Sequence, residues 1–425
     1  IILLSIFKGI ILLTPNSVNF CNIKSNFCSF TNAIAIGSGV LIAQLWGKKD
    51  ALNIKRTLSR SLFYNIILTL GFMILGLSLP GKIMSIFSND PAVINIGIDY
   101  LKIVVISYLF TSITFTFASG LRSIGNTKLP MWGSFIGLIV NGVLNAILIF
   151  GLFGAPKMGI KGAALATLIA RIVEFIIVVG AVYLKVDVLK LRFKDMLELS
   201  KSLSETLNKV TLPIFLNESC WAFGNITYTA IYASIGTSAA ASIQICSTIM
   251  NLFMIVAFGL ANAGVVIIGN EIGANREDEA ISASKKISSL SVKISIVLAI
   301  VLALLAKPIV SFFNVSAEVK MAAQYILYIY ALVMVFKVYN AVMIVGILRG
   351  GGDTTYGSIL QGLTLWLIGI PLAAFATFVL KLPVYFVVMF ATVEEIIKLL
   401  LMMRRFKSFK WIKNMVNDEQ NEVLT

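Results

Sequence analysis

One apolar segment in the middle of the chain carries a stripe of side chains that could bind a cation. An α-helix would place four of them on one face, at i, i+3, i+7 and i+10: Glu218, Trp221, Asn225 and Tyr228. Asn217 lies beside the stripe. Carboxylate and amide oxygens are ligands that hard cations prefer, and a buried carboxylate can instead carry a proton. We therefore expect Glu218 and Asn217 to bind Na⁺ or H⁺, with a structural ion pair or hydrogen bond of Glu218 as the alternative.

Two further polar pairs interrupt apolar segments. Lys337 and Asn340 are three residues apart, and Asn141 and Asn145 are four apart, so each pair shares one helix face. Polar groups in such segments usually face the interior of a helix bundle or a water-filled cavity. We expect both pairs to line a cleft with the stripe, and Lys337 to pair with Glu218, permanently or until a cation or the substrate binds and releases it. For the two asparagines, hydrogen bonding between helices is an equal alternative.

Other charged residues in apolar segments have partners nearby in sequence. Arg171 and Glu174 are three apart and are expected to neutralise each other. Glu394 and Glu395 precede Lys398 by about one helical turn. Pairing within the helix is therefore expected for at least one of these acids.

Composition indicates a lipid bilayer as the solvent. Of the 425 residues, 58% are hydrophobic and 13% are charged, against about 25% charged in soluble proteins. The chain has no histidine, which excludes histidine metal sites and proton relays, and its four cysteines lack metal-ligand spacing. No phosphate-binding GxxxxGK[ST] loop and no nucleophile constellation occurs. We expect no enzymatic activity and no cofactor.

Apolar segments near 20 residues, the length that crosses a bilayer, recur along the chain. Ten are clear: 62–79, 100–118, 129–153, 163–184, 211–235, 241–268, 288–306, 322–346, 357–378 and 383–403. A shorter one ends near Leu45. These segments predict an all-α polytopic membrane protein.

The basic residues predict its orientation. Alternate loops and the C-terminal stretch from Lys398 onward carry 24 lysines and arginines, whereas the loops on the other side carry six. The positive-inside rule then places the C-terminus in the cytoplasm. This distribution also accounts for the net charge of +15, because the basic residues flank spans and face anionic lipid. Nucleic acid is not expected as a partner.

Two short passages occur twice at nearly equal spacing. Leu121–Thr127 returns as Leu348–Thr354, 227 positions later, and Gln44–Gly47 returns as Asn270–Gly273, 226 positions later. Two matches in the same order indicate a duplicated half-protein. In a membrane protein, two equivalent halves suggest a transporter with its path between them. The shared glycines are expected to turn the chain at cytoplasmic helix ends, so the unshared polar residues are better candidates for function.

Residues 1–30 depart from this pattern. The repeat predicts a helix over about 14–42, yet the first part of that stretch holds four asparagines and a lysine, which are costly in hydrocarbon. We infer that the N-terminal segment is truncated or altered, so that the first helix is incomplete. A genuinely divergent N-terminus is the alternative.

The repeated passages resemble those of the multidrug and toxic compound extrusion (MATE) family. The matching pieces are Gly37–Gly47, Leu121–Thr127, Gly269–Gly273 and Arg349–Thr354, and the resemblance covers about 31–413. It implies twelve helices in two pseudo-symmetric six-helix bundles around a central cleft. The expected boundaries are a bundle over 1–184, a cytoplasmic linker over 185–209, a bundle over 210–403 and a basic cytoplasmic tail over 404–425.

The resemblance implies a monomeric, lipid-embedded antiporter of the plasma membrane that exports organic, often cationic, compounds in exchange for Na⁺ or H⁺. Glu218 matches a cation-coupling position of several members. Many relatives carry a second acid where segment 322–346 has none, so a two-acid site does not carry over. The alternatives are a lipid-linked saccharide flippase, for which Lys337 and Arg171 are too few cations, and an inactive truncated transporter.

Overall fold

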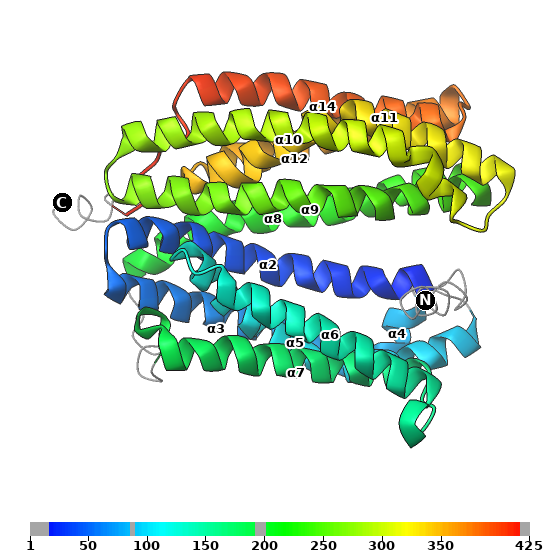
Figure 1. Ribbon diagram of the computed structural model, residues 1–425, viewed down its shortest axis with the longest axis horizontal. Coiled ribbons are helices and arrows are strands. Elements are labelled where there is room, and N and C mark those ends of the chain that lie inside the picture. Colours follow the sequence, from blue (N-terminus) through cyan, green and yellow to red (C-terminus); the bar gives the residue numbers. More distant parts are fainter. Residues whose placement is uncertain (1–16, 86–89, 192–200, 417–425) are drawn as a thin grey trace. The chain divides into compact units, whose positions relative to one another are not determined.

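The computed structural model describes residues 17–85, 90–191 and 201–416, which are almost entirely helical (Figure 1). Nine helices of this described part are long and apolar enough to cross a membrane. Two more, α8 (Lys201–Ile235) and α14 (Val384–Lys407), have the length as well. α14 falls outside the apolar set because Glu394, Glu395 and Lys398 lie within it. The predicted fold class, an all-α polytopic membrane protein, is confirmed, and each of the ten apolar segments coincides with an observed helix.

Helix α2 runs over Ser17–Gly47. Residues 1–16, on which much of the prediction for the N-terminus rests, lie outside the described residues. From Ser17 to Gly47 the backbone is helical, including Asn19, Asn22 and Asn26 of the asparagine-rich stretch.

The first compact unit contains the described residues up to 42 and from 51 to 207. Besides α2, its helices are α3 (Ala51–Ser78), α4 (Pro80–Ser85), α5 (Pro91–Ser123), α6 (Lys128–Phe150), η1 (Leu152–Gly154), α7 (Ile160–Lys185) and η2 (Asp187–Leu189). α7 packs against α5 and α6, and α5 packs against α3. Hydroxyl groups join helices here: Ser119 Oγ on α5 donates to the Ala35 carbonyl on α2 at 2.6 Å, an interhelical bond typical of membrane bundles.

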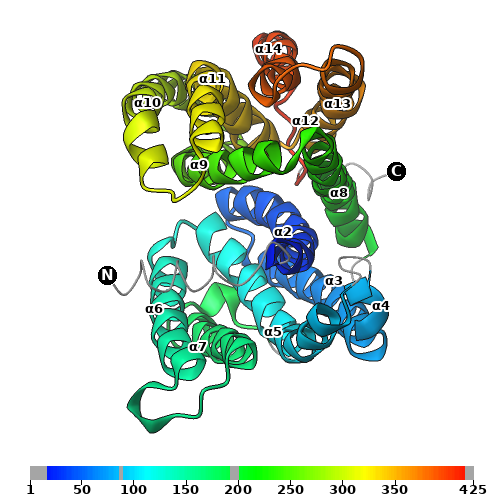
Figure 2. The ribbon, with the colours of Figure 1, turned by 90° about the vertical axis from the view of Figure 1, so that its right-hand side faces the viewer.

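The second unit contains residues 43–50, which end α2, and the chain from 208 onward. Its helices are α8, α9 (Thr237–Gly273), α10 (Glu277–Ser311), α11 (Ala317–Ala341), η4 (Val342–Leu348), α12 (Thr354–Thr364), η5 (Leu365–Gly369), α13 (Ile370–Ala374), η6 (Phe375–Val379) and α14. η4, η5 and η6 are π-helical. α11 packs against α9, α10 and α14, and Figure 2 looks along these helices.

The repeated passages form matching turns. Gly125 has φ 85° and its counterpart Gly352 has φ 86°, a backbone conformation that glycine adopts without steric cost. In both turns the next amide donates to the carbonyl five residues back, at 2.9 Å, the bond that closes a helix end. The predicted glycine turns are therefore confirmed. Lys49 and Asn275, which correspond through the second repeat, also share positive φ, at 63° and 59°.

A short segment after α14 closes one end of the second unit. We call Trp411–Val416 the C-terminal strap. The Lys413 amide donates to the Gly351 carbonyl at 2.8 Å, and Lys413 Nζ lies 2.7 Å from Asp353 Oδ1. Gln44 Nε2 donates to the Lys413 carbonyl at 3.1 Å. The strap thus holds the end of α2 and the turn before α12 together.

Candidate functional site

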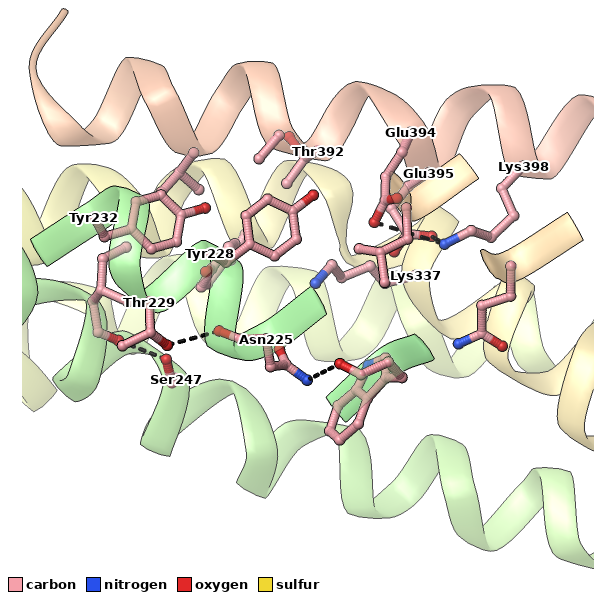
Figure 3. Close-up of a pocket in the computed structure, with 17 residues that line it drawn as sticks. Asn225, Tyr228, Thr229, Tyr232, Ser247, Lys337, Thr392, Glu394, Glu395 and Lys398 are labelled. Carbon is pink, nitrogen blue, oxygen red and sulfur yellow. Dashed lines mark hydrogen bonds and ion pairs between the residues drawn. The ribbon is translucent and has the colours of Figure 1, made fainter. Parts of the chain in front are cut away.

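The second unit contains a polar pocket among α8, α9, α11, α12, η5 and α14 (Figure 3). It has two adjoining lobes of about 210 Å³ and 330 Å³. Both lobes are lined by Trp221, Asn225, Lys337, Gln361, Glu395 and Lys398. Aromatic rings and charged groups therefore share one cavity, the composition expected of a site for an organic ligand.

Three of the four stripe residues on α8 line this pocket. Trp221 is 46% exposed, and Asn225 Nδ2 donates to its carbonyl at 3.1 Å. Tyr228 stacks on Tyr232 with ring centroids 5.9 Å apart. The helical spacing thus predicted correctly that these three side chains share a face, while their role in binding stays a prediction.

The fourth, Glu218, has a different neighbour from the one expected. Arg349 Nη2 lies 3.3 Å from Glu218 Oε1 and donates to Asn217 Oδ1 at 3.2 Å. Asn217 Nδ2 donates to the Ser358 carbonyl at 3.2 Å. The expected pairing of Glu218 with Lys337 is wrong. The buried guanidinium has several donors in one plane, so it bonds the carboxylate and the amide together.

The strongest concentration of charge in the pocket lies on α14. Lys398 Nζ lies 3.8 Å from Glu394 Oε1 and 3.5 Å from Glu395 Oε2, so the predicted pairing within the helix is confirmed. The two acids are 8% and 9% exposed and the lysine 5%. Buried charges of this kind are costly unless paired.

α11 contributes the remaining polar groups. Asn340 Nδ2 donates to Glu395 Oε2 and to the Glu395 carbonyl, each at 2.8 Å. Lys337 extends into the pocket (Figure 3), and its Nζ lies 5.4 Å from the centroid of the Tyr330 ring. Lys337 and Asn340 therefore line the same lobe as Trp221 and Asn225, while their part in a substrate cleft stays a prediction.

A glycine on η5 makes room for two pocket oxygens. A β-carbon at Gly369 would lie 2.2 Å from Tyr228 Oη and 2.9 Å from Glu394 Oε2. Both oxygens therefore occupy space that any other side chain would fill. Glu394 Oε2 is buried and has no hydrogen-bond partner among the described residues.

The remaining candidates lie in the first unit. Asn145 Nδ2 donates to Asn141 Oδ1 at 3.1 Å, and Asn141 Nδ2 donates to Thr167 Oγ1 at 3.4 Å. The expected Arg171–Glu174 ion pair is present. These contacts agree with the alternative of interhelical hydrogen bonding for the asparagines and leave their part in a substrate cleft a prediction.

Sequence reasoning missed that the α14 charges face the pocket. It treated Glu394, Glu395 and Lys398 only as a helix-internal set. The available signal was their depth: three charged residues midway along the last apolar segment are expensive in lipid, and such residues usually face a cavity. The role of Gly369 had no signal, because it depends on side chains from two other helices.

Membrane-length helices, matching turns in two halves and a polar pocket inside a helical unit define a polytopic helical membrane protein with an internal binding pocket. The profile of the MatE family matches residues 19–147 and 213–375, well over half of the chain. The chain belongs to the MatE family, so the resemblance inferred from the repeated passages is confirmed, and the protein is a transporter and not an enzyme. The match begins within the segment that the sequence marked as atypical.

Similar proteins agree with this family. A probable multidrug resistance protein, YoeA of Bacillus subtilis, is 26% identical over 349 residues, which cover 81% of this chain and 75% of that protein. The probable multidrug resistance protein NorM of Thermotoga maritima is 25% identical over 343 residues, covering 80% and 73%. A crystal structure of MATE in complex with MaL6 superposes with a TM-score of 0.86 at 18% identity, covering 96% of this chain and 92% of that one. It supports the twelve-helix fold.

Proposed function

We propose that this transporter is a secondary antiporter that exports organic, often cationic, compounds in exchange for Na⁺ or H⁺. The observation that carries the proposal is the pocket of the second unit, where the rings of Trp221 and Tyr228 share a cavity with the carboxylates of Glu394 and Glu395. Aromatic faces attract organic cations, and the two carboxylates offset the charges of Lys337 and Lys398, so the pocket does not repel a cation. Relatives named as multidrug resistance proteins support the same substrate class.

Exchange requires that cation and substrate bias one conformational equilibrium through different affinities for its two states. The protein acts as a monomer in the plasma membrane, with its C-terminus in the cytoplasm. Two places offer an acid for the coupling cation: Glu218 with Asn217, where Arg349 is already bound, and the α14 acids in the pocket. Asn141 and Asn145 of the first unit remain candidates for a second part of the substrate path.

A flippase for lipid-linked saccharides is less well supported. A pyrophosphate group needs a surplus of positive charge in its site. Two lysines line the pocket, Lys337 and Lys398, but Glu394 and Glu395 line it as well. The four formal charges cancel, so the pocket offers no net attraction for a polyanion.

The test is efflux of ethidium from cells that express the full chain. Replacing Trp221 with Ala removes an aromatic face from both lobes of the pocket, so we expect at least a fivefold loss of efflux at equal membrane insertion. Trp132→Ala is the matched control, because Trp132 is an exposed tryptophan of the first unit, and it should leave efflux unchanged.

The energy source is tested in the same cells. Ionophores that collapse the Na⁺ and H⁺ gradients should stop efflux, whereas ATP depletion with the gradients maintained should not. Efflux that continues without either gradient, or that the Trp221→Ala variant performs at the normal rate, would contradict the proposal.

A further inference from the structure

The two acids of the pocket are not equivalent. Glu395 is held by Asn340 Nδ2 at 2.8 Å and by Lys398 at 3.5 Å on the same oxygen, Oε2. Glu394 has only a longer approach, 3.8 Å from its Oε1 to Lys398 Nζ. Its other oxygen, Oε2, is buried without a partner in the described part of the chain. Glu395 is thus held by two neighbouring groups, whereas one oxygen of Glu394 accepts no hydrogen bond.

A buried acceptor that bonds nothing is destabilising. Protonation of Glu394 would remove this cost, because a protonated carboxyl group gains an O–H donor. Tyr228 Oη borders the same face of Gly369 as Glu394 Oε2 but makes no hydrogen bond to it, so it is a nearby oxygen toward which a new O–H could turn. The geometry thus offers one protonation position, with a phenol oxygen nearby.

The two acids leave no comparable position for a metal cation. Sodium, like other hard cations, requires several oxygen ligands around one point. Between the two carboxylates that point is taken by the ammonium of Lys398, at 3.8 Å and 3.5 Å. Lys398 is 5% exposed and lies on the same helix as both acids. Na⁺ would have to displace a tethered cation, whereas a proton needs only one free oxygen.

We propose that the coupling ion is a proton and that Glu394 Oε2 carries it, with Lys398 holding the position that a metal cation would otherwise take. This inference rests on the proposed antiport function and names its ion and its acid. The other charged or titratable groups around Glu394 are Glu395 and Lys398 on α14, Lys337 and Tyr330 on α11, and Tyr228 and Tyr232 on α8.

The charge count explains the exchange. With both acids ionised, the two carboxylates and the two lysines sum to zero. With Glu394 protonated, the cluster carries one positive charge. A cationic substrate therefore binds the deprotonated pocket more tightly than the protonated one, and a proton on Glu394 weakens its binding.

The test uses the purified full chain in liposomes, with ethidium as the probe. In Na⁺-free buffer a pH gradient alone should drive ethidium transport by the wild type, and an Na⁺ gradient at equal pH should not. Glu394→Gln should reduce transport driven by the pH gradient at least tenfold. Glu277→Gln, an exposed acid at the start of α10, is the matched control and should transport as the wild type does.

Two readouts separate coupling from folding. Glu394→Gln, which mimics the protonated acid, should bind ethidium only as weakly as the wild type does at low pH, with an affinity that no longer changes with pH, and Glu394→Asp should regain transport driven by the pH gradient with a displaced pH dependence. Transport by the wild type on an Na⁺ gradient alone would overturn the inference and leave the antiport function standing. Loss of coupling in Glu218→Gln but not in Glu394→Gln would do the same. No transport of ethidium under either gradient would overturn the antiport function itself.

Discussion

At the scale of single residues, Gly369 is a position where the pocket has no room for a larger side chain. Tyr228 Oη and Glu394 Oε2 both lie where a β-carbon would be, at 2.2 Å and 2.9 Å from it. Both distances are under 3.0 Å, a separation that real β-carbons essentially never show, so at least one of these side chains must move if a methyl group is added. Adding a methyl group at Gly369 would therefore disturb both the Tyr228 hydroxyl and the Glu394 carboxylate.

We predict that Gly369→Ala lowers stability by about 1–3 kcal/mol, the usual cost of overpacking, and reduces ethidium efflux. Thermal unfolding in detergent and dye efflux measure the two effects. Adding Tyr228→Phe to this variant removes the nearer oxygen, so the double variant should be more stable than Gly369→Ala alone.

The matched control is Gly259→Ala on α9, where no atom lies within 4 Å of the added carbon. It should be neutral or slightly stabilising, because alanine favours a helix over glycine. Equal unfolding temperatures for Gly369→Ala and Gly259→Ala would show that Tyr228 and Glu394 do not occupy this space.

The residue scale also shows what sequence alone can reach. The shared face of Trp221, Asn225 and Tyr228 followed from helical geometry. The partner of Glu218 did not, because Arg349 lies 131 residues away and comes close only when the turn before α12 forms. Periodicity gives the direction of a side chain from its helix but carries no information on which group of another helix lies there.

At the scale of elements, the repeated turns also bring the ends of two helices into close contact. Where α2 and α9 end, a glycine of each helix lies against the backbone of the other. A β-carbon at Gly47 would lie 2.0 Å from the Asn270 carbonyl oxygen, and one at Gly273 would lie 1.9 Å from that of Gln44. The four residues form two equivalent pairs in the repeat, so the contact is reciprocal.

We predict that Gly273→Ala is more destabilising than Gly369→Ala. The obstacle is backbone, which cannot rotate away as a side chain can, so the ends of α2 and α9 must separate. We expect a loss of more than about 3 kcal/mol, seen as a lower unfolding temperature and a smaller amount of folded protein in the membrane. Gly180→Ala on α7, with open space around the added carbon, should behave as the wild type. A Gly273→Ala variant that folds and has the unfolding temperature of the wild type would contradict this close contact between the ends of α2 and α9.

Sequence reasoning located the elements well and their ends less well. The predicted segment 288–306 lies inside α10, which runs over Glu277–Ser311. Hydropathy marks only the part of a helix that lies in lipid, whereas backbone hydrogen bonds continue through the polar turns outside it. The π-helical segments η4 to η6 had no signal in the apolar pattern, because a π-turn leaves the composition of a span unchanged.

At the scale of the whole molecule, the position of the C-terminal strap relates the side that the C-terminus faces to the side of the repeated turns. The C-terminal strap bonds to the turn at Gly351 and Asp353 and to Gln44 near the end of α2. The tail therefore lies at the same end of the second unit as these turns, which are among the basic loops on the expected cytoplasmic side. Labelling one position after α14 therefore shows which side of the membrane these turns face.

We predict a cytoplasmic C-terminus, because inverting the chain would place its many basic loops on the side with less anionic lipid and against the membrane potential. Single cysteines test this in a background where Cys21, Cys28, Cys220 and Cys246 are alanine. Ser311 ends α10 at the expected outer side, and Ser408 follows α14 at the expected inner side; both are exposed. A membrane-impermeant maleimide applied to intact cells should label Ser311→Cys, and it should label Ser408→Cys only after permeabilisation. The reverse pattern would place the C-terminus outside, and the pocket would then take up its organic substrates from the opposite side.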